Sequence, residues 1–119
     1  MRKKLESLLL NALDDYKTLN IVNINVQKLT TEMDSMIIAT GTSTRHVKSA
    51  SSSLVEYANK QQFEIFGLEG ENSGEWILID FVDVVAHIFN KEKRAFYDLE
   101  KLWADAKIYT LGNSTEPVS

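Results

Sequence analysis

Hydrophobic residues recur along this chain with two different periods, and the changes of period predict an order of helices and strands. Leucine and alanine recur every three or four residues between positions 3 and 18, which predicts an amphipathic helix that buries one leucine stripe. The same spacing returns between positions 43 and 60, with Thr42 or Ser43 as the N-cap. We interpret the first helix as a core-packing element.

Five segments have the pattern of β-strands: residues 21–26, 36–39, 63–68, 76–79 and 84–89. The first alternates, as a half-buried strand does, whereas the second is uniformly apolar, as in a central strand covered on both faces. The last two flank a break at residues 80–83, where a hairpin would turn. With a final helix from about residue 91, this order predicts an α/β fold: a single domain with a mixed five-stranded sheet and helices packed on it.

The hairpin predicted at residues 76–89 has two unlike faces when it is read with a period of two. One face is purely apolar and belongs to the core. The other combines apolar side chains with carboxylates and a histidine: Trp76, Leu78, Asp80, Asp83, Val85, His87 and Phe89. Such a face is either packed under a helix with its polar groups hydrogen-bonded, or left partly open as a protein-binding surface. The pattern alone leaves both interpretations open.

Composition narrows the range of functions. A chain of 119 residues, 44% of them hydrophobic, can close one core without metal or disulfide support. Because there is no cysteine, disulfides, cysteine-zinc sites and thiol catalysis are excluded, and a reducing compartment is favoured. No apolar run approaches the roughly 20 residues of a membrane span, so we expect a soluble protein. The net charge of -4 favours a basic protein as partner over extensive direct contact with nucleic acid.

The ends of the chain are interpreted from their polarity. We expect the domain to occupy residues 1–106 and residues 107–119 to form a flexible C-terminal tail, since this segment is polar and contains the only proline. At the other end, Glu6, Asn11 and Asp14 interrupt the apolar region that a signal peptide would need. We therefore expect a helix of the mature fold, no transit peptide, and a bacterial cytoplasmic location.

One candidate for phosphate binding is the segment Gly41-Thr42-Ser43, between a predicted buried strand and a predicted helix. A helix N-terminus offers free backbone N–H groups, and Arg45 and His46 follow in the first turn. The segment lacks the glycine spacing and the lysine of a P-loop. An ordinary capped helix is therefore the favoured interpretation.

Asp80 and Asp83 raise the alternative of a magnesium-dependent nucleotidyltransferase, which would combine them with Gly41 and Ser43. On one continuous strand, carboxylates three residues apart point to opposite faces, and only an intervening turn would bring them together. Turn-capping or partner contact is the favoured role for both. His87 has no second histidine at ligand spacing and no paired nucleophile. We therefore expect no catalytic residue, no metal and no cofactor.

Three blocks of sequence, GTSTRHVKSA, LEGENSGEWILIDFVDVVAHIF and RAFYDLEKLWADA, occur in this order at residues 41–50, 68–89 and 94–106. Together they resemble the ribosomal silencing factor family, also called the Iojap family, over roughly residues 5–106. The resemblance implies an α/β fold related to nucleotidyltransferases but without their working active site, and so no enzyme. It also implies docking on universal large-subunit protein fourteen of the large ribosomal subunit. Bound there, the protein would block joining of the small subunit and repress translation when nutrients are short.

The resemblance implies a partner-binding surface that consists of Trp76, Leu78, Asp80, Phe81, Asp83, His87, Arg94, Tyr97 and Leu99. Trp76 and Tyr97 would be its anchors, and the two aspartates would meet Lys or Arg of the partner, setting orientation and association rate more than affinity. A homodimer that uses the same mixed face is the alternative occupant.

One residue departs from the family pattern, which usually has glycine where this chain has Val82. A β-branched residue resists positive φ. We therefore expect a turn that is shifted or differently shaped around Phe81 and Asp83.

Overall fold

The computed structural model describes residues 2–28, 30, 31, 33–93 and 107–110. Its helices and strands are α1 (Arg2–Asp15), β1 (Leu19–Asn25), β2 (Ser35–Gly41), α2 (Thr44–Lys60), β3 (Gly67–Glu69), β4 (Trp76–Asp80), β5 (Val84–Asn90) and β6 (Lys107–Thr110). The described strands form one sheet in the order β3-β4-β5-β2-β1-β6. β2 and β5 pair in parallel near its centre, and the other neighbours pair antiparallel. The predicted α/β fold with a mixed sheet is confirmed.

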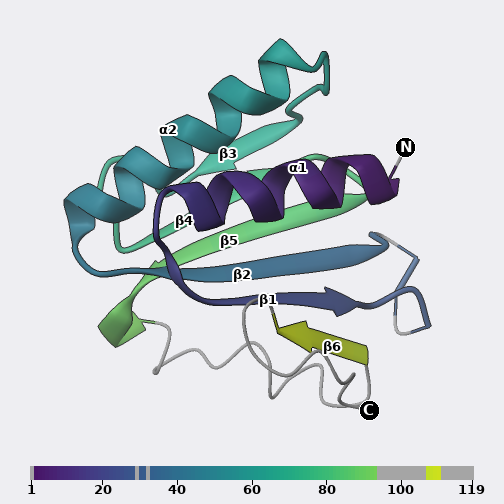
Figure 1. Cartoon of the computed structure of the whole chain (residues 1–119), viewed down its shortest axis with the longest axis horizontal. Coiled ribbons are helices and arrows are strands. Elements are labelled where there is room, and N and C mark those ends of the chain that lie inside the picture. Colours follow the sequence, from purple (N-terminus) through teal and green to yellow (C-terminus); the bar gives the residue numbers. More distant parts are fainter. Residues whose placement is uncertain (1, 29, 32, 94–106, 111–119) are drawn as a thin grey trace.

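Both helices lie on the same face of this sheet (Figure 1). The predicted leucine stripe of α1 supplies Leu5, Leu9 and Leu13 to the helix-side core, where α2 contributes Val47 and Leu54. All five side chains are at most 5% exposed. The sheet supplies the floor of this core with Ile37, Ile77, Ile79, Ala86 and Ile88. Among the described helices, none combines the length and apolar content needed to cross a membrane.

The loop that leads from β2 into α2 is shaped by a glycine and an N-cap. Of the two predicted candidates, Ser43 is the N-cap, and its Oγ accepts a hydrogen bond from the His46 backbone N–H at 3.0 Å. A Cβ on Gly41 would lie 2.6 Å from Val47 Cγ2 and 3.0 Å from the Val47 backbone nitrogen. Gly41 is therefore required for the loop to pack against the first turn of α2.

The five predicted strands are present, and two boundaries require correction. β3 begins at Gly67 rather than residue 63; Phe63 and Ile65 precede the strand and pack against the helix-side core. Residues 107–110, which polarity had placed in the tail, form β6 and extend the sheet beside β1. The rest of the predicted tail, residues 111–119, lies outside the described residues.

The helix predicted from about residue 91 begins where expected. Residues 91–93 are helical, and Asn90 Oδ1 accepts a hydrogen bond from the Lys93 backbone N–H at 2.9 Å, as an N-cap side chain does. Lys93 Nζ also lies 3.6 Å from Glu75 Oε2, which links this start to the loop before β4. The remainder of the predicted helix lies outside the described residues.

Candidate docking surface

The register of β4 and β5 separates the hairpin into the two predicted faces. Ile77, Ile79, Ala86 and Ile88 all point into the helix-side core. We call the opposite side the mixed face; its residues are Trp76, Leu78, Asp80, Val85, His87 and Phe89. The β5 members of the mixed face are buried, at 9% exposure or less, whereas the β4 members are partly exposed. The mixed face is thus buried along β5 and partly exposed along β4, while both described helices pack on the opposite face.

Trp76 is held in place by two neighbours on β5. Its Nε1–H donates a hydrogen bond to His87 Nδ1 at 2.9 Å. Its ring stacks on Phe89, with centroids 4.9 Å apart and an angle of 21° between the planes. A partner that binds this indole therefore finds it already ordered, which lowers the entropic cost of association. Phe89 was absent from the predicted docking residues, although its place on the mixed face and the antiparallel register opposite Trp76 indicate this support.

His87 supports Trp76 in one protonation state. Burial lowers the pKa of His87 from 6.5 to about 4, because the charged ring would lose its hydration. Nδ1 accepts the indole N–H only when it carries no proton, so the neutral ring has its hydrogen on Nε2. With 6% exposure, His87 acts mainly by positioning Trp76 rather than by presenting its own surface.

The turn between β4 and β5 is closed by the side chain of Asp80. Its Oδ1 accepts a hydrogen bond from the Val82 backbone N–H at 2.7 Å, and the Phe81 N–H donates to the Val84 carbonyl at 2.9 Å. Val82 has a φ of 75°, so the valine takes the left-handed conformation that it was expected to resist. The turn therefore keeps a backbone suited to glycine, and Asp80 has the turn-capping role that was favoured for it.

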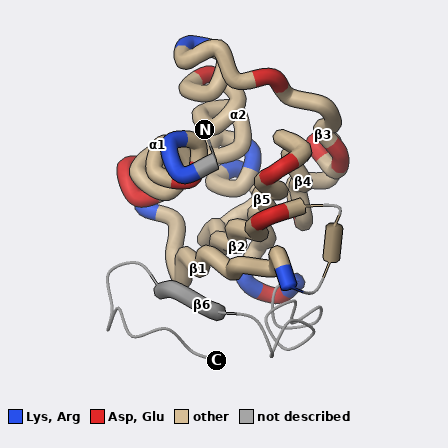
Figure 2. The backbone as a smooth tube through the Cα atoms, turned by 90° about the vertical axis from the view of Figure 1, so that its right-hand side faces the viewer, with Lys and Arg blue, Asp and Glu red and all other residues tan. Residues whose placement is uncertain are grey.

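The remaining predicted docking residues are placed unequally. Asp83 is exposed at the tip of the turn, and Figure 2, which faces this end of the sheet, shows acidic residues beside the ends of β3, β4 and β5. Phe81 is only 5% exposed and belongs to the helix-side core, so it supports the turn from beneath and offers no surface contact. Arg94, Tyr97 and Leu99 lie outside the described residues.

The residues of the alternative active site are far apart. β2 and β5 are parallel, with Ser35 paired to Val84 and Gly41 to Asn90. Asp83 therefore lies beside the start of β2, whereas Gly41 lies at its end. Six residues of strand separate the two positions by about 20 Å. Within the described residues, no three His, Asp or Glu side chains are grouped as metal ligands would be.

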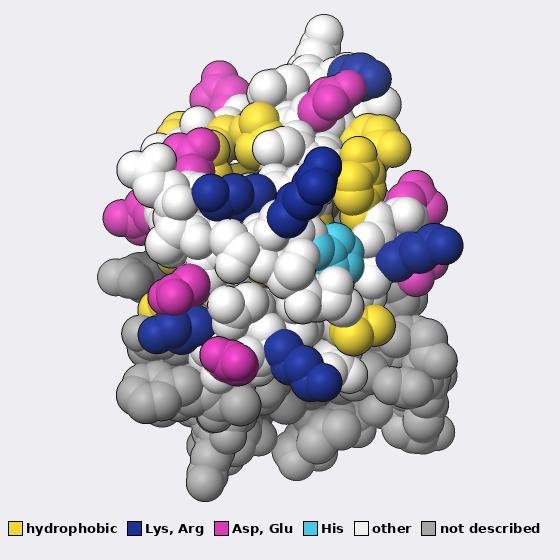
Figure 3. All heavy atoms as spheres, turned by 90° about the vertical axis from the view of Figure 1, so that its left-hand side faces the viewer, with side chains coloured by type: hydrophobic (Ala, Val, Ile, Leu, Met, Phe, Trp, Pro, Cys, Tyr) yellow, Lys and Arg dark blue, Asp and Glu magenta, His cyan; other side chains and the backbone are white. Residues whose placement is uncertain are grey.

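The Gly41-Thr42-Ser43 segment is already occupied by its own hydrogen bonds. The Thr42 backbone N–H donates to His46 Nδ1 at 2.9 Å, and His46 Nε2 lies 2.7 Å from the Tyr16 carbonyl oxygen. One neutral tautomer, with the hydrogen on Nε2, satisfies both bonds. Figure 3, which faces this end, shows Lys and Arg side chains spread over the surface around a histidine side chain. The Thr42 and His46 backbone N–H groups are thus engaged within the chain, which favours the capped-helix interpretation.

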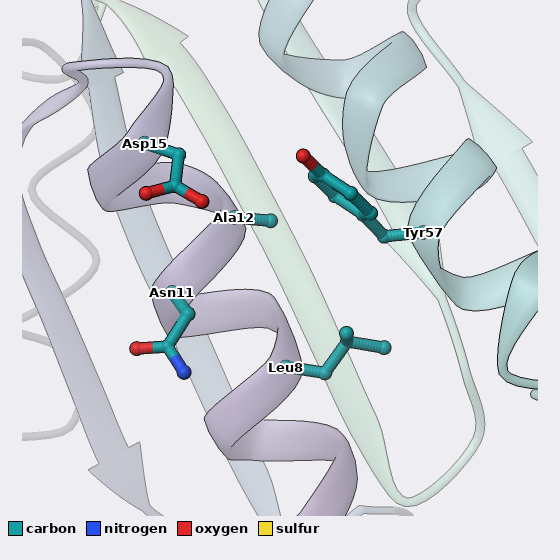
Figure 4. A pocket seen from close by; sticks show the side chains of 5 residues that line it. All are labelled: Leu8, Asn11, Ala12, Asp15 and Tyr57. Atoms are coloured by element: carbon teal, nitrogen blue, oxygen red, sulfur yellow. The ribbon is translucent and has the colours of Figure 1, made fainter.

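A shallow groove between α1 and α2 is too small for an ordinary ligand site. Its volume is about 110 Å³, and it is lined by Leu8, Asn11, Ala12, Asp15 and Tyr57. The ring of Tyr57 points across the groove toward α1 (Figure 4). Small-molecule sites usually enclose about 300–1,000 Å³ and bring several polar groups together. This groove offers one carboxylate and no nucleophile, so the mixed face is the stronger candidate.

Comparison with known proteins decides the family. A family model described as ribosomal silencing factor during starvation matches residues 2–118 of this chain. The chain belongs to the ribosomal silencing factor family. Family membership links the protein to the ribosome and to regulation of translation.

Individual ribosomal silencing factors match over most of their length. The factor of Halalkalibacterium halodurans is 40% identical over 104 residues, covering 87% of this chain and 89% of the relative. That of Haemophilus influenzae is 41% identical over 96 residues, covering 81% of this chain and 94% of the relative. A crystal structure of a Chromobacterium violaceum protein superposes with a TM-score of 0.84 at 36% identity and covers 98% of both chains. The fold described above is therefore the fold of this family.

Proposed function

We propose that this protein binds the large ribosomal subunit through universal large-subunit protein fourteen and, while bound, blocks the small subunit from joining. It would thereby repress translation when nutrients are scarce, in the cytoplasm of a bacterium. Steric blocking requires affinity and bulk but no catalytic group, so the proposed factor is not an enzyme.

The observation that carries the docking site is the ordered, partly exposed indole of Trp76. Aromatic residues that are fixed before binding and bordered by polar groups are the usual anchors of protein interfaces. Leu78 and Asp80 follow it along the open β4 edge of the mixed face, and Asp83 ends the series at the turn. With Arg94, Tyr97 and Leu99 from the following segment, these residues form the proposed docking surface.

Charge also supports a protein partner. The chain has 17 acidic and 13 basic residues, which suits a basic ribosomal protein better than bare RNA. Asp80 and Asp83 would steer the approach and fix the orientation of the complex. Asp80 already accepts the Val82 N–H through Oδ1, so its other oxygen remains the one to meet a cation.

A subunit-joining assay with purified ribosomal subunits tests the blocking step. Added protein should reduce the yield of joined ribosomes in proportion to its occupancy of the large subunit. Full joining in the presence of a bound factor would contradict the steric mechanism. Loss of joining together with nucleotide turnover would favour a catalytic mechanism instead.

Co-sedimentation with large subunits tests the docking surface. Trp76→Ala should weaken binding by about 100-fold, as expected for loss of a central aromatic anchor. Tyr16→Ala is the matched control, because Tyr16 is an aromatic side chain that is 41% exposed beyond the end of α1. Light scattering of both variants measures the oligomeric state, and loss of a dimer in Trp76→Ala alone would favour the homodimer alternative. Equal binding by folded Trp76→Ala and by the parent would remove the docking assignment.

A further inference from the structure

Four large hydrophobic side chains are exposed in the part of the chain that the structure describes, and they form two pairs at opposite ends of the sheet. Tyr16 and Leu19 lie at the α1–β1 connection, beside the end of β2. Phe66 and Val82 lie at the end where β4 turns into β5. Phe66 has the largest exposure, at 61%, and Val82 is 42% exposed. The second pair adjoins the proposed docking surface, and the first does not.

Phe66 and Val82 are held beside each other by one residue. The Phe66 backbone N–H donates to the Asp80 carbonyl oxygen at 2.8 Å, and the Val82 N–H donates to Asp80 Oδ1 at 2.7 Å. Both backbones are thus fixed relative to Asp80 before any partner arrives. Phe63, Ile65 and Leu68 pack against the helix-side core, whereas Phe66 is left outside it. The core therefore does not account for the phenylalanine.

Val82 adds a second indication that this end serves binding. A β-branched residue at a φ of 75° costs about 1–3 kcal/mol relative to a residue suited to that conformation. The cost is not recovered by burial, since the side chain is 42% exposed. Strain of this kind, kept at the surface beside a second exposed apolar group, indicates a contact made in a complex.

The charges around the pair indicate the chemistry of the partner. The segments 63–69 and 80–84 contain Glu64, Glu69, Asp80 and Asp83 and no Lys or Arg. Glu64, Glu69 and Asp83 are exposed, and Asp80 is partly exposed. An apolar pair bordered by carboxylates is complementary to a protein segment that presents an apolar side chain between Lys or Arg residues.

We infer that Phe66 and Val82 extend the docking surface around the end of the sheet and receive a basic segment of the protein that Trp76 contacts. The inference rests on the proposed function. It adds a second anchor about five residues of strand, roughly 17 Å, from Trp76. It also makes the interface a strip along β4, which fixes the angle at which the factor sits on its partner.

The test compares Phe66→Ser with Leu19→Ser in binding to purified large subunits. Leu19 is a matched control, since it is 46% exposed and lies at the opposite end of the sheet. Phe66→Ser should raise Kd about tenfold and Leu19→Ser should leave it unchanged. Val82→Asn, which keeps a residue tolerant of positive φ while removing the apolar side chain, should raise Kd about threefold. Thermal unfolding confirms that each variant is folded.

Trp76→Ala, measured in the same series, distinguishes failure of the proposed function from failure of its extension to Phe66 and Val82. If Trp76→Ala loses binding while Phe66→Ser and Val82→Asn bind like the parent, the extension is wrong and the proposed function stands. If the parent binds no large subunit, or if Trp76→Ala binds as the parent does, the proposed function itself fails. If Phe66→Ser converts a dimer to a monomer without changing Kd for the subunit, the patch receives a second copy and the inference is overturned.

Discussion

The two faces of the β4–β5 hairpin differ in how far their side chains are exposed. The helix-side face is uniformly apolar and fully buried on both strands, with Ile77, Ile79, Ala86 and Ile88 at 1% exposure or less. The mixed face is buried on β5 and open on β4. In the sheet, β5 lies between β4 and β2 and is flanked by side chains of both strands, whereas β4 has only the three-residue β3 beyond it. The helix-side face therefore stabilises the fold, whereas the mixed face exposes the side chains of β4, with Trp76 ordered by its neighbours on β5.

The sharpest way to separate the faces is a pair of truncations one residue apart. Ile79→Ala should lower the free energy of unfolding by about 2–5 kcal/mol, because Ile79 is 0% exposed and its removal leaves a cavity. Leu78→Ala, on the partly exposed β4 side of the mixed face, should cost about 1 kcal/mol or less but weaken subunit binding. Urea unfolding and co-sedimentation measure the two effects. Equal stability losses would show that the faces are not divided as described.

The pH dependence of stability tests the buried histidine of the mixed face. The folded pKa of about 4 lies below the unfolded value of 6.5, so the unfolded chain binds the proton first as pH falls. The contribution of His87 is complete above pH 6.5 and is lost progressively between 6.5 and 4, by about 3 kcal/mol. His87→Gln lacks this titration. The difference in unfolding free energy between parent and variant should shrink across that range, and parallel curves would contradict it.

Relief of backbone strain is expected to be smaller. Val82→Gly removes the penalty of a β-branched residue at a φ of 75°, less the entropy that glycine adds to the unfolded chain. The net gain should be about 1 kcal/mol, or about 4 °C in the unfolding midpoint. Differential scanning calorimetry measures it. Destabilisation instead would mean that the valine side chain makes a contact worth more than its strain.

The smallest expected effect concerns the charge at the tip of the turn. Asp83→Asn should slow association with the large subunit about threefold at low salt and leave the dissociation rate nearly unchanged, since an exposed carboxylate acts mainly by steering. Asp14→Asn, an exposed carboxylate in α1, is the control. Surface plasmon resonance at two salt concentrations gives both rates. A change confined to dissociation would place Asp83 in a direct, desolvated contact.

How far the sequence predicts this molecule depends on the range of each interaction. The period of two assigns Ile79 and Leu78 to opposite faces, because alternation is a local property of strands. The N-cap at Ser43 likewise follows from local hydrogen bonding. The difference in exposure between Trp76 and His87 depends on the order of strands in the sheet. Local periodicity does not predict that order. The apolar pattern of residues 63–68 predicted a strand, but it did not predict that Phe66 would be exposed.

The candidate active site shows the same limit. Gly41, Ser43, Asp80 and Asp83 belong to plausible motifs, yet the parallel pairing of β2 and β5 places the two halves at opposite ends of the sheet. In the same way, Phe81 lies within the docking motif but points into the helix-side core. A motif specifies residue types and spacing, whereas the direction of each side chain follows from the pairing of distant strands.

The parallel pairing of β2 with β5 also has a consequence for folding. Residues 35–41 meet residues 84–90, so the central pair of the sheet forms only after α2, β3 and β4 have been enclosed in one long loop. Such distant contacts carry a large loop-closure entropy and slow the folding of the chain. Trp76 depends for its orientation on His87 and Phe89, and the strand that carries them, β5, is fixed in the sheet by this pairing with β2. During synthesis, a chain that has not yet reached residue 87 therefore lacks both supports of the proposed anchor.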